Sequence, residues 1–317
     1  MLRLLTFIFL GFVISFSALA QNIFEKDTSF TTHSAYLKEK KKYPFITVFK
    51  PVISKEIIVK PNIPFKNLGY RKLNFDITYP KRKSKEGYPV VVLIFGGGWK
   101  SGDKNMCQAQ ASYLAQNGYV AVAVEYRLSP ETIYPAAVQD IKEAIRWVRA
   151  NAKNYPINPY KIAVMGASAG GQLAALVGNS AGERIYQSGA NLYLSDEVQA
   201  VVDIDGTLAF HHPESEEGAV AAQWLGGTYA EKPQIWEEAA GLNHVNSQSP
   251  PFLFLNSSNP RFHAGQNDMI AKLNEFNIYS EVHLFPNTPH TFWLFHPWFD
   301  DIMKYAIQFL DKTLKDK

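Results

Sequence analysis

Short apolar runs alternate along this chain with stretches in which apolar residues recur at the spacing of a helix. The runs predict strands at residues 90–95, 119–125, 161–165, 198–204, 252–255 and 279–285. Helices are expected at residues 137–150, 171–178, 265–276 and 302–314. Strands that alternate with helices form a mostly parallel sheet with helices on both faces. The pattern therefore predicts an α/β fold, to which the alternating residues 73–79 add an edge strand.

The first twenty residues have the pattern of a secretory signal peptide. Arg3 precedes an apolar stretch at residues 4–16, and the small residues Ala18 and Ala20 form a cleavage site. An uncleaved anchor is the alternative, but the stretch is short for a membrane-spanning helix. We predict cleavage after Ala20 and a periplasmic or secreted protein without a stable membrane anchor.

The rest of the chain is predicted to have two parts. Residues 21–70 are polar with scattered prolines, and we expect them to wrap the body as an N-terminal arm. Residues 71–317 form one α/β domain. A long insertion at about 207–245 follows the sixth strand of that domain and is expected to form a lid.

Composition supports this fold without identifying its chemistry. The chain has 317 residues, of which 46% are hydrophobic and 19% charged, enough for one sizeable core. A net charge of +3 does not indicate a nucleic-acid partner. Because Cys107 is the single cysteine of the sequence, no disulfide can form within the chain.

A serine flanked by glycines follows the predicted strand at 161–165. The run Gly166-Ala167-Ser168-Ala169-Gly170 matches G-x-S-x-G and precedes the predicted helix at 171–178. Between strand and helix this motif is a nucleophile elbow, a turn so sharp that the serine takes strained backbone angles. Glycines two residues before and after the serine keep side chains from colliding there. Ser168 is therefore a candidate nucleophile, and the next amide, on Ala169, can face a developing oxyanion.

Three glycines follow the predicted strand at 90–95. The run Gly96-Gly97-Gly98 lets backbone amides approach a ligand and matches the oxyanion loop of lipases and esterases. A phosphate-binding loop is the alternative, but the spaced second glycine that it needs before Lys100-Ser101 is missing. Phe95 stands where such loops often carry histidine, which leaves the geometry of the loop open.

His290 lies on the loop that follows the predicted strand at 279–285. A histidine after the last strand, behind the serine in chain order, is the position of the general base in such hydrolases. Imidazole titrates near neutral pH, which suits the transfer of a proton in both directions. His296 lies beyond this loop among aromatic residues and is expected to pack against them.

Further motifs follow the order found in one family. Residues 125–131 read Glu-Tyr-Arg-Leu-Ser-Pro-Glu, residues 134–137 read Tyr-Pro-Ala-Ala, and residues 158–174 contain the serine motif. Over residues 70–315 the chain resembles α/β-hydrolases of the hormone-sensitive-lipase-like, bacterial carbohydrate-esterase type. The resemblance implies an α/β-hydrolase fold with Ser168 as nucleophile and His290 as base. It also implies an oxyanion hole formed by the amides of Gly97, Gly98 and Ala169.

The acid of the triad departs from the family pattern. An Asp usually follows the seventh strand, but residues 256–263 contain no carboxylate, and the next acid, Asp268, lies within the predicted helix at 265–276. Asp205 ends the preceding strand, a position that some lipases of this fold use for the acid. We predict Asp205, with Asp268 or a Glu of the insertion as alternatives. An ordinary turn residue is the other interpretation of Asp205-Gly206.

Residues 211–217 of the insertion form a rival cluster with the sequence His-His-Pro-Glu-Ser-Glu-Glu. Adjacent histidines rarely bind one ion, and Pro213 breaks the helical spacing of a zinc site. We predict a solvated polar loop, with no metal and no cofactor.

Trp99, Arg261 and His263 are candidate substrate-binding residues. Arg261 and His263 are expected at the mouth of the pocket, where an arginine either clamps a uronic-acid carboxylate or bonds to loop carbonyls. Trp99 belongs to the glycine-rich loop, and aromatic faces around a cleft stack on sugar rings.

Together these features predict an exported serine esterase that removes acyl groups, above all acetyl, from plant cell-wall polysaccharide or oligosaccharide. The alternatives are a serine peptidase or a lipase of the same fold, and a catalytically weak sugar-binding protein. Peptidases of this fold usually carry a large gating domain, and a lipase needs a more apolar lid than residues 213–218. The oligomeric state stays open.

Overall fold

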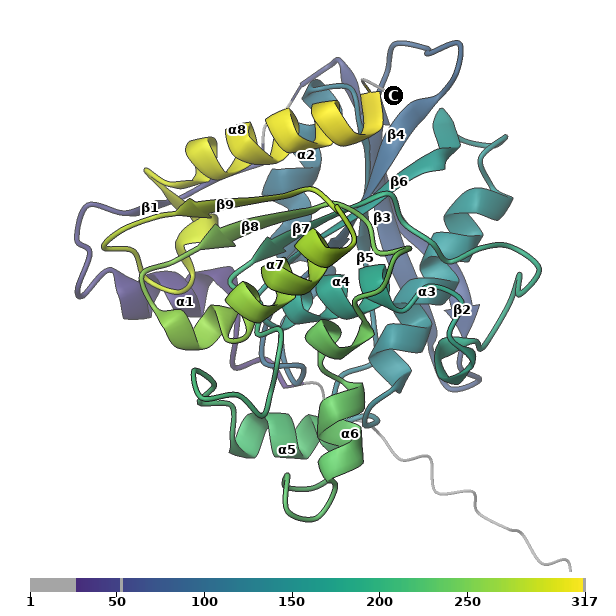
Figure 1. Ribbon diagram of the computed structural model, residues 1–317. Coiled ribbons are helices and arrows are strands. Elements are labelled where there is room, and N and C mark those ends of the chain that lie inside the picture. The colour runs from purple at the N-terminus through teal and green to yellow at the C-terminus, as the bar shows by residue number, and fades with distance from the viewer. Residues whose placement is uncertain (1–26, 52–53, 316–317) are drawn as a thin grey trace, which may run out of the picture.

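An eight-stranded sheet lies between two layers of helices in the computed structural model, which describes residues 27–51 and 54–315 (Figure 1). In order across the sheet, the strands are β2 (Ile57–Asn67), β3 (Lys72–Pro80), β5 (Val120–Val124), β4 (Tyr88–Ile94), β6 (Ile157–Ala167), β7 (Ala200–Ile204), β8 (Phe252–Asn256) and β9 (Ser280–Leu284). From β5 to β9 neighbouring strands run parallel, whereas β3 is antiparallel to both β2 and β5. The predicted α/β architecture is confirmed.

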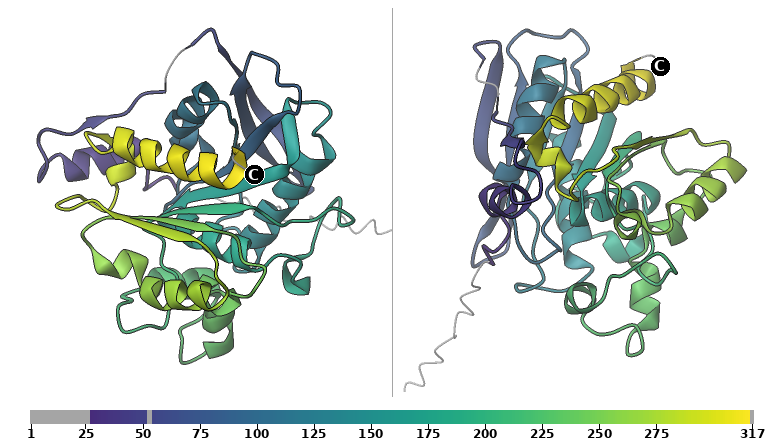
Figure 2. Two further views of the ribbon diagram at one scale, coloured as in Figure 1. Left: turned by 45° about the horizontal axis from the view of Figure 1, so that its top comes forward. Right: turned by 90° about the vertical axis from the view of Figure 1, so that its left-hand side faces the viewer.

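Helices cover both faces of this sheet (Figures 1 and 2). One layer contains α2 (Gln108–Gln116) and α8 (Phe299–Leu310), and the other contains α3 (Ala136–Ala150), α4 (Ala169–Asn179) and α7 (Gln266–Glu275). Because both faces are covered, the central strands β4, β5, β7 and β8 are almost continuously buried, which explains their unbroken apolar runs. Every residue of α4 is buried, so it is the innermost helix of its layer.

The prediction that residues 73–79 form an edge strand is wrong, because β2 pairs with β3 and lies outside it. Most β2 residues are exposed or half-buried, and Phe65 is its one buried side chain. Such a strand shows little hydrophobic alternation, which is why the sequence pattern missed it. Residues 57–67, part of the expected N-terminal arm, are therefore a strand of the main sheet.

Earlier residues of that arm lie against the C-terminal part of the chain. Helix α1 (Thr32–Glu39) begins with a capping box formed by Thr31 and Ser34. Strand β1 (Thr47–Val48) then pairs with β10 (Phe295–His296), and Phe49 stacks on Phe299 with ring centroids 3.7 Å apart. These contacts fix the arm beside the loop that contains His290. The predicted signal peptide at residues 1–20 lies outside the described residues.

The expected insertion separates β7 from β8 and contains α5 (Ala219–Leu225), α6 (Pro233–Glu238) and the 3-10 helix η3 (Gly241–His244). Trp224 of α5 is fully buried, and Trp236 of α6 is 5% exposed, so both short helices are anchored by aromatic packing. The remaining short elements are η1 (Lys104–Cys107), η2 (Arg184–Tyr186), η4 (Pro260–His263), η5 (Phe292–Leu294) and η6 (Asp311–Lys315).

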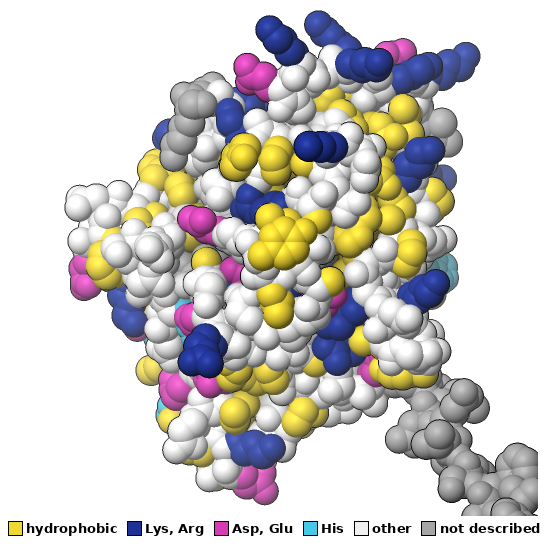
Figure 3. Space-filling model, turned by 90° about the vertical axis from the view of Figure 1, so that its right-hand side faces the viewer, with side chains coloured by type: hydrophobic (Ala, Val, Ile, Leu, Met, Phe, Trp, Pro, Cys, Tyr) yellow, Lys and Arg dark blue, Asp and Glu magenta, His cyan; other side chains and the backbone are white. Residues whose placement is uncertain are grey.

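Surface charge is mixed on the face drawn in Figure 3. Lys and Arg gather along its upper edge, and hydrophobic and acidic side chains are interspersed below them. Within the described ranges, every helix is too short or too polar to cross a membrane.

Helix α4 packs unusually close to the sheet because glycine occupies its contact positions. A Cβ atom on Gly170 would lie 2.1 Å from the carbonyl oxygen of Ile94, and one on Gly166 would lie 1.9 Å from the carbonyl oxygen of Gly170. Both contacts involve backbone atoms, which cannot move aside as a flexible side chain could. The turn between β6 and α4 therefore has its sharpness only with glycine at both positions.

We expect Gly170→Ala to lower the free energy of unfolding by about 3 kcal/mol or more, because its methyl group overlaps the backbone of β4. Gly218→Ala is the matched control, since a Cβ there meets no atom within 4 Å, and we expect it to cost less than about 1 kcal/mol. Urea unfolding followed by circular dichroism measures both. Equal losses in the two variants would contradict the close-packing argument.

Candidate active site

Ser168 stands at the turn between β6 and α4 with φ 56° and ψ −124°. These angles lie outside the regions that residues with side chains ordinarily occupy. The Ser168 amide donates a 2.8 Å hydrogen bond to the carbonyl oxygen of Ile204, and the Ser168 carbonyl accepts from Gln172 within α4. Bonds on both sides of the turn hold the strained serine at the carboxyl edge of the sheet.

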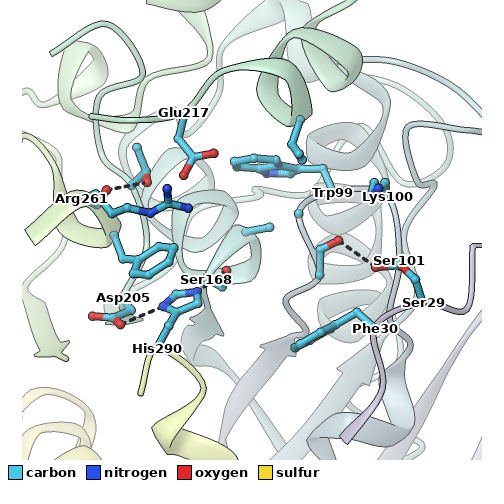
Figure 4. Close-up of a pocket in the computed structure, with 16 residues that line it drawn as sticks. Ser29, Phe30, Trp99, Lys100, Ser101, Ser168, Asp205, Glu217, Arg261 and His290 are labelled. Carbon is cyan, nitrogen blue, oxygen red and sulfur yellow. Dashed lines mark hydrogen bonds and ion pairs between the residues drawn. The ribbon is translucent and has the colours of Figure 1, made fainter. Parts of the chain in front are cut away.

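Ser168, His290 and Asp205 form a continuous hydrogen-bonded chain (Figure 4). His290 Nδ1 lies 2.9 Å from Asp205 Oδ2, and His290 Nε2 lies 2.9 Å from Ser168 Oγ. Because a carboxylate only accepts, Nδ1 donates to Asp205, which leaves Nε2 free to accept from the serine hydroxyl. This is the tautomer in which the imidazole can remove the serine proton.

The Asp205 carboxylate is held by β8 as well as by His290. Asp205 is 1% exposed, its Oδ1 accepts from the Ser257 amide at 2.7 Å, and its own amide donates to the Leu255 carbonyl oxygen at 3.1 Å. Its φ of 51° is left-handed, a conformation that Asp tolerates better than most residues. The end of β8 and the residue after it thus hold Asp205 beside His290.

The two alternative acids lie elsewhere. Asp268, in the first turn of α7, has a side chain that is 65% exposed and pairs with His212 at 3.3 Å. Glu217 of the insertion lines the cavity above Ser168 (Figure 4), and burial raises the pKa of its carboxyl group. The structure brings Asp205, and neither alternative, into hydrogen-bonding distance of His290.

A second buried acid supports the Asp205 turn. Asp203 is 1% exposed and accepts a 2.9 Å hydrogen bond from the Gly206 amide. Burial, followed by the nearby Asp205 carboxylate, raises the pKa of Asp203 well above its usual value. The raised pKa favours the neutral form of Asp203 beside the Asp205 carboxylate.

The three predicted oxyanion donors line the same cavity. Gly97 and Gly98 belong to the glycine-rich loop after β4, and Ala169 is the first residue of α4. Gly97 has φ 137°, and its carbonyl oxygen accepts from both the amide and the hydroxyl of Ser101 at 3.1 Å. Phe95, which replaces the usual histidine, stacks on Tyr126 at 4.4 Å, and the Tyr126 hydroxyl donates to the Phe95 carbonyl oxygen. Aromatic packing and this bond hold the loop where a histidine would otherwise do so.

Trp99 lines the cavity but is held mainly by protein contacts. It is 3% exposed, its indole N–H donates to Gln172 Oε1 at 2.9 Å, and its ring stacks on Trp224 at 5.0 Å. Gln172 also donates to the Ala239 carbonyl oxygen. This network connects the glycine-rich loop, helix α4 and the insertion, so Trp99 offers little free surface for a sugar ring.

Arg261 and His263, predicted at the mouth of the pocket, differ in position. Arg261 lines the cavity, and its Nη1 donates to Glu216 of the insertion at 3.1 Å. His263 is not among the lining residues. Both belong to η4, whose residues Arg261 and Phe262 line the cavity. The residue between them, Phe262, stacks on His290 with centroids 3.4 Å apart.

The cluster at residues 211–217 makes separate contacts. His211 stacks on Tyr229 at 3.7 Å, and His212 pairs with Asp268 and Glu214. Among the described residues, no three potential metal ligands lie close enough together to hold an ion.

The cavity has a volume of 390 Å³ and includes residues that sequence reasoning missed. Ser29 and Phe30 form one wall, across from Glu217 (Figure 4), and Val220 also lines the cavity. Ser29 and Phe30 belong to the irregular arm, where neither motif nor periodicity marked them. Phe262 was passed over because only the polar residues beside it suggested chemistry.

Comparisons with known proteins agree with this architecture. The family model BD-FAE matches residues 75–264. The esterase LipC of Mycobacterium tuberculosis is 33% identical over 186 residues, which are 56% of this chain and 46% of the relative. The chain spans less than half the length of the first curated relatives it matches.

Solved structures extend the likeness to most of the chain. A truncated carbohydrate esterase from gut microbiota superposes with a TM-score of 0.73 at 25% identity, over 84% of this chain and 99% of that one. An acetyl ester-xyloside bifunctional hydrolase from Caldicellulosiruptor lactoaceticus gives a TM-score of 0.65 at 22% identity, over 75% and 88%. The fold is that of an α/β-hydrolase, as the sequence motifs indicated.

We expect Asp205→Asn to lower kcat by about 10⁴-fold for p-nitrophenyl acetate, because an amide at this position favours the wrong histidine tautomer. Asp268→Asn, on the outside of α7, is expected to change kcat by less than about twofold. Steady-state kinetics on both variants measure this difference. Comparable losses in the two variants, or an unchanged kcat for Asp205→Asn, would remove Asp205 from the triad.

The raised pKa of Asp203 predicts a pH-dependent stability. The folded chain keeps a proton that the unfolded chain loses above its usual pKa of 3.8, so this contribution to stability is complete below that pH and falls as the pH rises. Asp203→Asn removes the titration, while its amide oxygen can still accept from Gly206. Relative to the wild type, we expect the free energy of unfolding of the variant to rise by up to about 1.4 kcal/mol per pH unit between about pH 5 and about pH 7. Urea unfolding at both pH values tests this, and a constant difference would mean that folded Asp203 is ionised.

Proposed function

The chain belongs to the BD-FAE family, and from this premise we propose that it is a serine carboxylesterase that removes acyl groups from an acylated carbohydrate. The observation that carries the proposal is the unbroken hydrogen-bonded chain from Asp205 through His290 to Ser168, at the base of an open cavity. LipC is an esterase, and the two structural relatives are a carbohydrate esterase and an acetyl ester-xyloside bifunctional hydrolase.

In the first half of the reaction, Ser168 Oγ attacks the ester carbonyl carbon while His290 Nε2 takes its proton. Asp205 stabilises the imidazolium that forms and keeps the ring oriented through Nδ1. The negative charge on the carbonyl oxygen is stabilised by the amides of Gly97, Gly98 and Ala169, each of which contributes about 10²–10³ in rate. The imidazolium then returns the proton to the departing alcohol oxygen, and an acyl group remains on Ser168.

In the second half, His290 removes a proton from water as the water oxygen attacks the acyl carbon. The bond to Ser168 Oγ then breaks while the imidazolium returns the proton to Oγ, which releases the carboxylic acid and restores Ser168. The cavity surroundings suit this cycle, because Phe262 stacks on the imidazole face and holds the ring against displacement. The raised pKa of Asp203 favours its neutral form, which limits repulsion with the neighbouring Asp205 carboxylate.

The substrate is proposed to be an acetylated plant cell-wall polysaccharide or a fragment of one. Export to the periplasm or the medium, inferred from residues 1–20, gives the enzyme access to polymers. A carboxylate clamp by Arg261 is disfavoured, because Arg261 already donates to Glu216 and a second acid, Glu217, lies beside it. A neutral sugar is therefore favoured over a uronic acid beside Arg261.

Acetate release from acetylated xylan and from acetylated pectin, by residues 21–317, tests the function. We expect release by the wild type and a loss of about 10⁶-fold in Ser168→Ala, because the acyl acceptor is removed. The better polymer identifies the substrate class. Release that persists in Ser168→Ala would contradict the mechanism, and cleavage of small synthetic esters alone would contradict the carbohydrate substrate.

A further inference from the structure

A second cavity adjoins the one that contains Ser168. It has a volume of 850 Å³, and the two cavities share Phe30, Arg261, Phe262 and His290. One wall of this groove comes from α1 and the residues after it, and the other comes from the loops that follow β8 and β9. Such a volume lies in the upper part of the range of ligand pockets, about 300–1,000 Å³.

The chemistry of ester cleavage assigns different halves of the substrate to the two cavities. Ser168 and the proposed oxyanion donors line the first cavity only, so the acyl group must lie there. The alcohol oxygen has to receive its proton from His290 Nε2, and His290 is the residue of the triad that both cavities share. An alcohol that leaves on the side of His290 therefore extends into the groove.

The lining of the groove suits a sugar chain. Its aromatic residues Phe30 and Tyr43 offer apolar surface on which sugar rings can pack. Beside charged residues such as Lys42, the lining also has neutral amide and hydroxyl side chains, including Asn259 and Asn287, which both donate and accept hydrogen bonds as sugar hydroxyls do. Tyr43 is fixed by edge-to-face contacts with Phe45 and Trp298, so this wall is preformed.

The wall that residues 29–43 of the N-terminal arm contribute to the groove lies outside the region that the BD-FAE model matches, which starts at residue 75. It is attached to the body by the pairing of β1 with β10 and by the stacking of Phe49 on Phe299. The backbone of Asp27 also forms an isolated β-bridge with Ser101 of the glycine-rich loop. Residues 29–43 can therefore determine which alcohols are accepted without any change in the triad.

We propose that this groove binds the saccharide part of the ester, and that residues 29–43 make the enzyme selective for acyl groups on oligosaccharides over those on single sugars. The proposal rests on the proposed carbohydrate esterase function and specifies its alcohol side. It assigns specificity-determining roles to Phe30, Lys42, Tyr43 and Asn259, none of which belongs to the triad or the oxyanion loop.

Asn259→Trp provides the sharpest test because Asn259 is exposed, lines the groove and lies outside the first cavity. The kcat/KM is compared for p-nitrophenyl acetate, an acetylated monosaccharide and the matching acetylated tetrasaccharide, of xylan or pectin origin, whichever the wild type cleaves faster. We expect the wild type to prefer the tetrasaccharide by about tenfold, and Asn259→Trp to lose that preference while it keeps the other two rates within about twofold.

Asn274→Trp is the matched control, since Asn274 is an exposed asparagine of α7 that lines neither cavity. Lys42→Ala, with its neighbour Lys41→Ala as control, examines the arm wall separately. We expect Lys42→Ala to raise KM for the tetrasaccharide by about threefold or more, and Lys41→Ala to leave it unchanged.

The outcomes separate the two proposals. A wild type that cleaves monosaccharide and tetrasaccharide equally well would overturn the groove assignment, as would an Asn259→Trp variant that keeps its tetrasaccharide preference or loses activity on all three esters alike. Cleavage of p-nitrophenyl acetate without any cleavage of acetylated sugars would overturn the proposed saccharide substrate but would still support esterase activity. Absence of all Ser168-dependent ester hydrolysis would overturn the proposed function itself.

Discussion

The close contact between α4 and the sheet is the constraint on which the site depends. Gly170 allows the backbone of α4 to approach Ile94 of β4, and Gly166 allows the chain to reverse between β6 and the helix. The helix can then start directly at Ser168, whose strained angles direct its hydroxyl out of the turn. With larger side chains at these positions the turn would open, and Ser168 would move away from His290.

The parallel sheet accounts for the convergence of residues that are far apart in the chain. Strands β4, β6, β7, β8 and β9 all end at one edge, so the loops that follow them meet there. Asp205 comes from β7, and its carboxylate is held by the Ser257 amide after β8. In this family the acid usually follows the strand that corresponds to β8. Asp205, at the end of β7, can take the same place because both loops lie against the same imidazole.

Two segments outside the regular alternation shape the space above this edge. The insertion supplies Glu217 and Val220 on one side, and the N-terminal arm supplies Ser29 and Phe30 on the other. The insertion is anchored through the stacking of Trp224 on Trp99, and the arm through the pairing of β1 with β10. These contacts hold both segments in place beside the cavity.

The sequence by itself determined the parts of this protein that depend on local patterns. Buried strands show as apolar runs, and the turns at Ser168 and Gly97 show as glycines, because only glycine fits such backbone contacts. The prediction of His290 as the base followed from its position behind Ser168 in chain order. The outer strand β2 escaped detection because its side chains are mostly exposed. Tertiary structure alone decided that Asp205, and not Asp268, lies within hydrogen-bonding distance of His290, that His263 does not line the cavity, and that Phe30 does. Each depends on which loops meet in space, and distances between loops leave no periodic or compositional trace along a chain.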